Sequence, residues 1–449
     1  MHHGSAAPAV PSAASVPPVT SDAGPHHSGP HHSGDQHSGD QHSAVGGGPS
    51  RLLVAWDPQM ERYDFGPLHP MQPVRLRLAM SLSRALRLLD GPDVLVEAPP
   101  VATDAELNTV HTPDLVAAVR ASSAGTGPVA GAAAFGIGSS DNPAFPGMHV
   151  VSARAVGGSL LAARAVADGR ARVAVNLAGG LHHAMPGRAA GFCVYNDVAV
   201  AIRDLLARGF ERVAYVDTDV HHGDGVQTVF ADDPRVLTVS LHQDPTTLWP
   251  GTGRADDTGG PGGAGTAVNI PLPPRTGDAG WRRAFDAVVP PVLRAYRPQI
   301  LVTQHGCDTH RADPLGGLRL SVEGQRAAAL DLAALADELC AGRWVVTGGG
   351  GYDLLDVVPR TWAHVVAAAG GQPLDPSTPL PAQWLAERAA VRSGISDDDE
   401  RVVTTMGDDA DAGFRRFGHG RGPTDPVDRA ILAVRAAAFP NFGLDPALD

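Results

Sequence analysis

The segment VDTDVHHGDG, residues 216–225, concentrates ionisable side chains directly after an apolar run that is typical of a buried strand. On a strand, Asp217, Asp219 and His221 point to the same face, because successive side chains alternate. Two buried carboxylates and an imidazole on one face repel and desolvate each other unless a cation lies between them. The spacing therefore predicts a metal site at the end of this strand.

Polar side chains also follow three other predicted strands. His182 and His183 follow VAVNLAGG, Asp308 follows ILVTQHG, and Tyr352 follows VVTGGGG. In sheets of parallel strands, ligands bind where the carboxyl ends of the strands meet. Four strand ends that each carry such groups predict one shared cleft.

The residue types in this cleft suit metal-assisted hydrolysis. Asp219, His221 and Asp308 offer two carboxylate oxygens and one imidazole nitrogen, a set typical of a zinc-type cation with an open position for water. Such a cation lowers the pKa of its bound water to about 7 and polarises a carbonyl oxygen. Asp217 would lie behind these ligands or bind another cation.

His182 and His183 could supply a general base and a general acid, each with a carboxylate behind it. The glycines at 348–351 would let the backbone bring the Tyr352 phenol close to the metal, where it could donate a hydrogen bond to a developing oxyanion. Taken alone, a histidine pair is also common on surfaces, and four glycines are also typical of a flexible turn. The catalytic interpretation therefore depends on the convergence of the strand ends.

Short apolar runs alternate with helical patterns over the central part of the chain. We expect strands at residues 51–56, 93–98, 172–180, 212–222, 235–242, 267–272, 299–306 and 343–351. Helical periodicity marks the stretches 69–89, 150–169, 192–209 and 321–342. This alternation predicts an α/β fold with a mostly parallel sheet and helices on both of its faces.

Composition divides the chain into three regions. Residues 1–50 are rich in Pro, Ser, Gly and His and have little to bury, which is typical of disorder; a metal-scavenging tail is the alternative. Residues 51–371 hold the strand and helix pattern of one catalytic domain. Residues 372–449 form an extension with an acidic run, SDDDERVV, and one short predicted helix at 424–439.

The composition also excludes several classes of protein. The 449-residue chain has a net charge of -13, and its 35 basic residues are all arginine. An acidic surface argues against nucleic-acid binding and is compatible with a cationic substrate. Cys193, Cys307 and Cys340 are too few and scattered for a disulfide framework, and we find no membrane-length apolar run and no secretory signal. We therefore expect a soluble, cytoplasmic protein without membrane or nucleic-acid partners.

Other catalytic motifs are missing or misplaced. GPGGAG at 260–265 has the form of a dinucleotide-binding fingerprint, but it contains proline and precedes a strand instead of following one. No GxSxG, HExxH or P-loop pattern occurs, which argues against the corresponding serine hydrolases, metalloproteases and nucleotide hydrolases.

The chain resembles histone-deacetylase-like amidohydrolases. That family's motif order is matched by NLAGGLHHAMPGRAAGFCVYNDVAVAI, VAYVDTDVHHGDGVQTVF, WPGTG, TQHGCDTHRADPLGGLRLS and VTGGGGYD, and HPMQPVRLR and DNPAFPGM extend the likeness over residues 51–371. DNPAFPGM and DTHRADPLGGL are most similar to the bacterial acetoin-utilisation-type deacetylases. The resemblance implies an arginase/deacetylase-like α/β fold and zinc-dependent removal of acetyl groups from acetyl-lysine, with a metal-bound water as the nucleophile.

The resemblance also implies a role for each matching residue. The implied zinc ligands, with ferrous iron as the alternative metal, are Asp219, His221 and Asp308. The implied catalytic groups are His182 with Asp217, His183 with Asp224, and Tyr352. A structural potassium or other monovalent-cation site is implied at Asp217, Asp219, His221, Ser240 and Leu241. Substrate contacts are implied for Asp141 at the rim and for Gly191, Phe192 and Trp249 in the tunnel that holds the lysine chain.

Trp249 stands where the family usually has phenylalanine, which keeps an aromatic wall but adds bulk to the tunnel. An acetylpolyamine amidohydrolase, acting on small acetylated amines, is the alternative within the same superfamily. A two-metal ureohydrolase of the arginase type would need carboxylates to bind its second metal at the positions where this chain has Gly223 and His310, so we expect one zinc. A silent scaffold that only binds acetylated partners would have lost Tyr352 or a metal ligand, and none is lost.

Overall fold

The computed structural model describes residues 50–125, 127, 129–393, 401–418 and 424–448. The disordered leader predicted for residues 1–50 lies outside this part of the chain except for Ser50, which begins the first strand. The acidic residues at 397–400 of the predicted extension also lie outside it. The described residues belong to one compact unit, and the domain boundary at residue 371 stays a prediction.

An eight-stranded sheet with the order β2-β1-β3-β8-β7-β4-β5-β6 forms the centre of this unit. The strands are β1 (Ser50–Ala55), β2 (Val94–Glu97), β3 (Ala171–Asn176), β4 (Val213–Asp217), β5 (Val236–Gln243), β6 (Ala267–Leu272), β7 (Ile300–Gln304) and β8 (Trp344–Thr347). Every neighbouring pair runs parallel. The predicted α/β fold with helices around a parallel sheet is confirmed.

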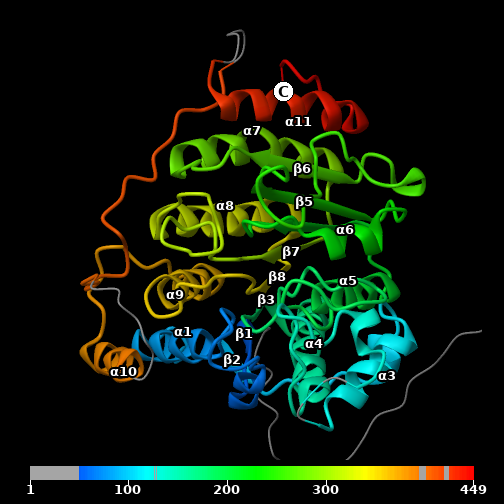
Figure 1. Ribbon diagram of the computed structural model, residues 1–449. Helices are drawn as coiled ribbons and strands as arrows, with labels where there is room; N and C mark the ends of the chain where they lie inside the picture. Colours follow the sequence, from blue (N-terminus) through cyan, green and yellow to red (C-terminus); the bar gives the residue numbers. More distant parts are fainter. Residues whose placement is uncertain (1–49, 126, 128, 394–400, 419–423, 449) are drawn as a thin grey trace, which may run out of the picture. The chain divides into compact units, whose positions relative to one another are not determined.

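Helices cover both faces of the sheet. They are α1 (Val74–Ala85), α2 (Asp104–Leu107), α3 (Pro113–Ser122), α4 (Met148–Ala167), α5 (Asp197–Ala207), α6 (Asp224–Phe230), α7 (Asp278–Tyr296), α8 (Val322–Cys340), α9 (Val357–Ala369), α10 (Ala382–Arg392) and α11 (Pro426–Ala438). Figure 1 shows α4, α5 and α6 on one side of the strands and α1, α7, α8 and α9 on the other, in agreement with the contacts between these elements.

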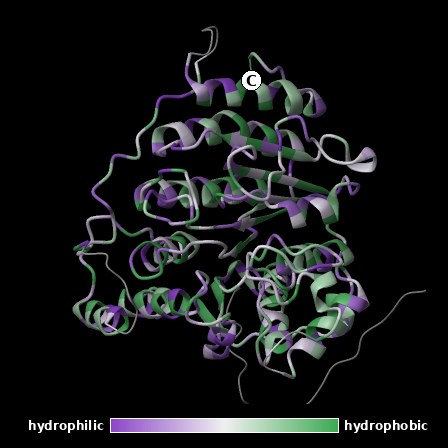
Figure 2. Ribbon diagram, in the orientation of Figure 1, coloured by the Kyte–Doolittle hydropathy of each residue, from purple (hydrophilic) through white to green (hydrophobic). Residues whose placement is uncertain are grey.

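Alternation along the strands builds two separate apolar layers. On β1, Leu52 and Val54 pack into the cluster that includes α7, α8 and α9, whereas Leu53 and Ala55 pack into the cluster that includes α4 and α5. Both strand faces are therefore buried, which explains why the strands read as continuous apolar runs. Figure 2 shows hydrophobic residues along the central strands.

Two helices differ from what composition suggests. Among the described residues, α4 alone is long and apolar enough to cross a membrane, but most of it is buried against the sheet and α5, as in a core helix. Helix α7 continues through Pro290 and Pro291, which normally interrupt a helix. Val288, Val289 and Leu293 are buried on its inner face, so packing outweighs the lost backbone hydrogen bonds.

The C-terminal helices complete the same unit at opposite ends of the sheet. Helix α10 packs against α1, and α11 packs against α7 and β6 (Figure 1). Pro426 occupies the first turn of α11, and the Asp425 side chain caps it by accepting a hydrogen bond from the Val427 amide.

Candidate active site

The residues with predicted chemistry lie beyond the carboxyl ends of β3, β8, β7 and β4, which are adjacent in the sheet. The loop after β3 carries His182 and His183, the loop after β4 carries Asp219 and His221, and the loop after β7 carries Asp308. The expected convergence of four strand ends is thus a property of the strand order.

Asp219, His221 and Asp308 form a cluster whose ligand atoms all lie within 4.8 Å of one another. His221 Nδ1 lies 3.0 Å from Asp219 Oδ1 and 3.2 Å from Asp308 Oδ2. The side chains of the two aspartates are essentially inaccessible to solvent. Three converging oxygen and nitrogen atoms of this kind fit a zinc-type cation with one position left open.

The oxygens that do not face His221 are held by the protein. Asp219 Oδ2 accepts hydrogen bonds from Gln304 Nε2 and the Gly350 amide, both at 2.8 Å. Asp308 Oδ1 accepts one from the Val220 amide at 3.0 Å. These bonds fix one oxygen of each carboxylate, and the other oxygen faces the imidazole of His221, where Asp219 Oδ1 also accepts from the His221 backbone amide at 3.0 Å. The arrangement prepares both carboxylates to bind a cation.

Gly350 is required by its close approach to both carboxylates. A Cβ atom at this position would lie 2.0 Å from Asp308 Oδ2 and 2.8 Å from Asp219 Oδ2. The glycines before Tyr352 thus bring the backbone against the cluster, and a flexible turn does not account for them.

The electrostatics of the cluster show its need for positive charge. Burial, followed by the neighbouring charge of Asp219, raises the pKa of Asp308 to about 8. Burial alone would lower the pKa of His221, but its hydrogen bonds to Asp219 and Asp308 outweigh burial and raise this pKa to about 10. The cluster holds protons in the position where a cation would neutralise it.

His182 and His183 are both buried and each has a carboxylate behind it. His182 Nδ1 lies 2.7 Å from Asp217 Oδ2, and His183 Nδ1 lies 2.7 Å from Asp224 Oδ1. Their Nε2 atoms lie 2.9 Å from each other. Since both Nδ1 atoms donate to carboxylates, the pair shares one proton between the two Nε2 atoms.

The two imidazoles are tuned in opposite directions. Burial lowers the pKa of His182, but the charges of Asp217 and Asp219 overcome burial and raise this pKa to about 9. Burial and the charge of His182 lower the pKa of His183 to about 4. At neutral pH this places the shared proton on His182 and leaves His183 Nε2 as an acceptor.

The start of helix α5 holds the loop that carries this pair. Asn196 Nδ2 donates to the carbonyl oxygens of His182 and Ala184, at 3.2 and 3.0 Å. The Asn196 side-chain oxygen also caps α5 through the Ala199 amide. One residue therefore ends the loop, begins the helix and fixes the histidine backbone.

Tyr352 lines the same pocket as the histidine pair and His221. Its amide donates to Asp313 Oδ2 at 2.7 Å, and its ring packs edge-on against Phe192 with the ring centres 5.6 Å apart. Burial, followed by the charge of Asp308, raises the pKa of Tyr352 well above its usual value. The phenol therefore keeps its proton and can donate a hydrogen bond.

Aromatic side chains connect this centre with the surface. The Trp249 ring lies 4.5 Å from the His183 ring, centre to centre, yet 46% of the residue is exposed. A Cβ atom on Gly191 would lie 2.5 Å from Trp249 Cη2, so glycine gives the indole room. Phe192 continues the wall toward Tyr352, and Asp141 is exposed, with its carbonyl oxygen 3.3 Å from His69 Nε2.

Ser240 and Leu241 lie on β5, next to the strand that leads into the cluster. Ser240 is paired with Asp217 in the parallel register. Its hydroxyl lies 2.8 Å from His242 Nδ1, while His242 Nε2 lies 2.8 Å from the Gly253 carbonyl oxygen. His242 must donate to Gly253, so Ser240 donates to His242 and keeps its oxygen lone pairs available.

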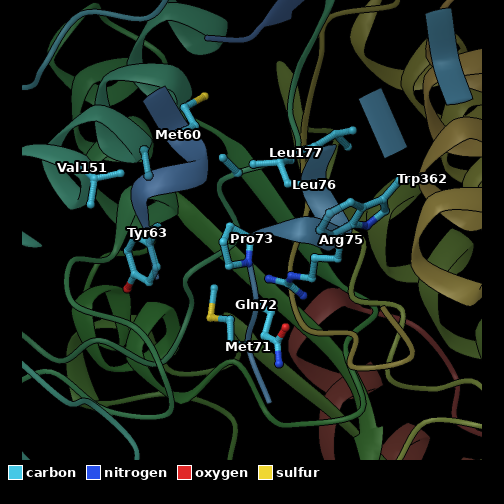
Figure 3. A pocket seen from close by; sticks show the side chains of 12 residues that line it. Met60, Tyr63, Met71, Gln72, Pro73, Arg75, Leu76, Val151, Leu177 and Trp362 are labelled. Carbon is cyan, nitrogen blue, oxygen red and sulfur yellow. The ribbon is translucent and has the colours of Figure 1, made fainter. Parts of the chain in front are cut away.

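A cavity of about 30 Å³ lies behind the reaction centre, and Figure 3 shows its lining. Met71 and Arg75 line both this cavity and the pocket that contains Asp219 and His221, so the two spaces adjoin. Arg75 donates from Nη1 to the Gly351 carbonyl oxygen at 2.9 Å. Its guanidinium also lies over the Trp362 ring, 5.1 Å from the ring centre.

Several residues that hold the centre were not identified from the sequence. Gln304 donates a hydrogen bond to Asp219, Asn196 holds the histidine loop, and Asp313 accepts from the backbone amide of Tyr352. Asp408 accepts from His310 Nε2 at 2.7 Å and pairs with Arg360 at 2.9 Å, behind the loop that carries Asp308. Only Asn196 has a local signal, because it directly precedes a predicted apolar helix.

Comparison with known proteins agrees with this geometry. The histone deacetylase domain model matches residues 69–369. The acetoin utilization protein AcuC of Bacillus subtilis (strain 168) is 39% identical over 330 residues, which cover 74% of this chain and 84% of that protein. AcuC of Staphylococcus xylosus is 37% identical over 351 residues, covering 77% of this chain and 90% of that protein.

Solved structures support the same relationship. The crystal structure of a histone deacetylase homolog from Aquifex aeolicus superposes with a TM-score of 0.73 at 28% identity, covering 87% of this chain and all of that one. A histone deacetylase homolog in complex with SAHA gives the same values. The sequence relatives, the domain match and the parallel sheet with its carboxylate and histidine centre agree. The chain belongs to the histone deacetylase family, and within it lies close to the acetoin utilization proteins.

Proposed function

We propose that this deacetylase is a metal-dependent lysine deacetylase that hydrolyses the acetyl amide of acetyl-lysine in proteins. The observation that carries the proposal is the single buried pocket lined by His182, His183, Asp219, His221 and Tyr352. It combines a cation-binding cluster, a proton-transfer pair and a phenol donor, the groups that amide hydrolysis requires. Acetylpolyamine hydrolysis is the second candidate, favoured by the net charge of -13.

Asp219, His221 and Asp308 would hold the metal, which we propose to be zinc, with ferrous iron as the alternative. The fit is supported by their converging atoms and by the raised pKa of Asp308. When bound, such an ion supplies a Lewis acid and lowers the pKa of its water. The hydrogen bonds from Gln304 and the Gly350 amide to Asp219 also support this assignment, because the carboxylate ligands of a metal are usually held in place by such bonds.

The histidine pair would move the protons of the reaction. Neutral His183 accepts the proton of the attacking water through Nε2, while Asp224 stabilises the charge that forms. His182 carries a proton that can pass to the leaving amine, and Asp217 fixes its orientation. Their opposite pKa values support this division into base and acid.

Tyr352 would donate its hydroxyl hydrogen to the carbonyl oxygen of the acetyl group. The oxygen gains negative charge as the tetrahedral intermediate forms, so the hydrogen bond is stronger in the transition state than with the substrate. The pKa of Tyr352, which burial raises well above its usual value, supports this role, because the phenol is protonated at neutral pH and can donate.

The lysine chain would reach the centre between Gly191, Phe192 and Trp249, with the substrate backbone held by Asp141 at the rim. A tunnel between aromatic rings suits four methylene groups. The acetate that is released would find the guanidinium of Arg75 at the boundary of the inner cavity. Opposite charge at this position favours departure of the product away from the rim.

A structural monovalent cation, potassium by our proposal, would lie beside β4 and β5. Asp217, Asp219, His221, Ser240 and Leu241 would surround it, mainly through main-chain and hydroxyl oxygens. Ser240 supports the site because its hydroxyl proton is donated to His242. We also propose a cytoplasmic location and no nucleic-acid or membrane partner, in keeping with three buried free cysteines and an acidic chain.

The test is acetate release by the purified, metal-quantified protein from an acetyl-lysine peptide and from N-acetylputrescine, measured side by side. A kcat/KM that is at least tenfold higher for the peptide supports the lysine deacetylase. The reverse preference assigns the protein to polyamine chemistry. Absence of release from either substrate by the metal-loaded protein contradicts both.

A further inference from the structure

A tight turn beside the tunnel presents a single leucine to solvent. The His69 amide donates to the Gly66 carbonyl oxygen at 3.1 Å, which closes a four-residue turn with Pro67 and Leu68 at its tip. Leu68 is 99% exposed. Pro67 restricts the backbone, so the turn cannot easily fold its leucine back onto the protein.

The turn is firmly attached to the tunnel wall. His69 is buried, and its ring centre lies 4.5 Å from that of Phe192. The Met71 amide donates to His69 Nδ1 at 3.1 Å, so His69 Nε2 carries the proton and donates to the Asp141 carbonyl oxygen at 3.3 Å. Leu68 therefore directly precedes a residue that contacts both Phe192 and the main chain of Asp141.

Trp249 lies against Gly191, the residue that precedes Phe192 in the chain. It contacts Gly191 and His183, whereas Phe192, the next residue after Gly191, contacts His69 and Tyr352. Nearly half of Trp249 is exposed. His69 and Trp249 thus contact consecutive residues of the wall, Phe192 and Gly191, and both Leu68 and Trp249 remain accessible.

We infer that Leu68 and Trp249 form a docking surface for an apolar side chain adjacent to acetyl-lysine in a peptide or protein substrate. The inference rests on the proposed function and adds to it a sequence preference. Burial of leucine and indole surface stabilises the complex only when the substrate brings an apolar group to the rim. The amines of an acetylated polyamine would gain nothing from Leu68, so the surface distinguishes the two substrate classes.

The experiment compares kcat/KM for acetyl-lysine heptapeptides that carry glycine, serine or leucine on each side of the acetyl-lysine. Burial of one leucine side chain predicts that the better leucine peptide exceeds the glycine peptide about tenfold. Serine should resemble glycine. In Leu68→Ser, the leucine preference should fall to about twofold or less, while the glycine peptide keeps its wild-type kcat/KM.

Leu448→Ser is the matched control, because it makes the same substitution at another exposed leucine, which is 73% exposed. It should retain the full preference for leucine. The inference is overturned if wild-type protein cleaves all peptides alike, or if the preference persists in Leu68→Ser. Failure of the proposed function gives a different result, since the glycine peptide and the leucine peptide would both be inert while N-acetylputrescine is hydrolysed, and this would overturn the inference as well.

Discussion

His182 and His183 contact each other through their Nε2 atoms, 2.9 Å apart, while their Nδ1 atoms donate to two different aspartates. While this contact is formed, before any proton is taken from the attacking water, only one of the two Nε2 atoms carries a proton. Because the pKa of His182 is raised and that of His183 is lowered, the pair acts as one unit with a defined charge.

This unit predicts strongly non-additive mutants. His182→Ala and His183→Ala should each lower kcat on an acetyl-lysine peptide by about 10²–10⁴-fold, the usual contribution of general acid–base catalysis. The double mutant should fall no more than about tenfold below the worse single mutant, because each change already breaks the shared contact. Losses that multiply would show instead that the histidines act independently.

Tyr352→Phe should reduce kcat by about a hundredfold or more, because it removes one hydrogen-bond donor to the developing oxyanion. The ring still packs against Phe192, and the backbone amide of residue 352 still donates its hydrogen bond to Asp313. The melting temperature should therefore stay close to wild type. Tyr296→Phe on α7 is the control, because its hydroxyl lies outside the site and makes a long hydrogen bond of 3.4 Å to the Pro234 carbonyl oxygen. A Tyr352→Phe enzyme with near-normal turnover would refute the assigned role.

Gly350→Ala should abolish stoichiometric metal binding, measured as metal content after gel filtration. The added methyl would lie 2.0 Å from the Asp308 carboxylate oxygen, so one of the metal ligands must move. Gly187→Ala is the control, because a Cβ there meets no atom within 4 Å. Full metal content in Gly350→Ala would mean that Asp308 does not bind the metal in this position.

Asp408→Asn should lower the free energy of unfolding by about 3 kcal/mol, as expected when one partner of a buried ion pair is neutralised. Burial would raise the pKa of Asp408, but the hydrogen bond from His310 and the charge of Arg360 hold it well below its usual range. Asp337→Asn should change stability by less than about 0.5 kcal/mol, because its pair with Arg172 is exposed. Urea unfolding followed by circular dichroism compares the two, and equal effects would contradict the prediction.

His111 should make the protein sensitive to mild acid. The backbone amide of Asn196 donates to His111 Nε2 at 2.9 Å. A proton on this nitrogen would therefore repel the backbone amide hydrogen. Burial lowers the pKa of His111 to about 4. Its stabilising contribution is therefore complete above its unfolded pKa of about 6.5 and is lost as the pH falls toward 4.

Between pH 7 and pH 5 this residue should cost about 2 kcal/mol of unfolding free energy. Urea unfolding of the metal-free protein at both pH values gives the slope. His111→Gln can accept from the same amide and has no proton to gain, so it should be less sensitive to pH by that amount. The same slope in wild type and mutant would exclude His111 as the cause.

Much of the sheet could be predicted from the sequence because the central strands β4, β5, β7 and β8 are buried on both faces and read as apolar runs. Helix α7 was not among the expected helices, since Pro290 and Pro291 normally mark an interruption and only the packed valines on either side explain its continuation. The local sequence pattern reflects only the helix propensity of each residue. In this stretch the burial of the helix in the tertiary structure outweighs the low propensity of the two prolines.

The groups at the strand ends could be proposed from type and spacing, but their supports could not. Asp313 and Asp408 look like ordinary surface acids in the sequence, and only the folded loops reveal that one holds Tyr352 and the other His310. The sequence predicts that the glycines at 348–351 allow a close approach of the backbone, and the structure shows that Gly350 approaches the carboxylates of Asp308 and Asp219.

The position of β8 between β3 and β7 has a consequence for how the enzyme is made. Among the described strands, residues 344–347 alone join the strand that leads to the histidine pair with those that lead to Asp219, His221 and Asp308. During synthesis, the edges of β3 and β7 that pair with β8 stay exposed until β8, the last strand in the sequence, leaves the ribosome. Acquisition of the metal centre should therefore be a late folding event, and chains that end before residue 344 should be prone to aggregate.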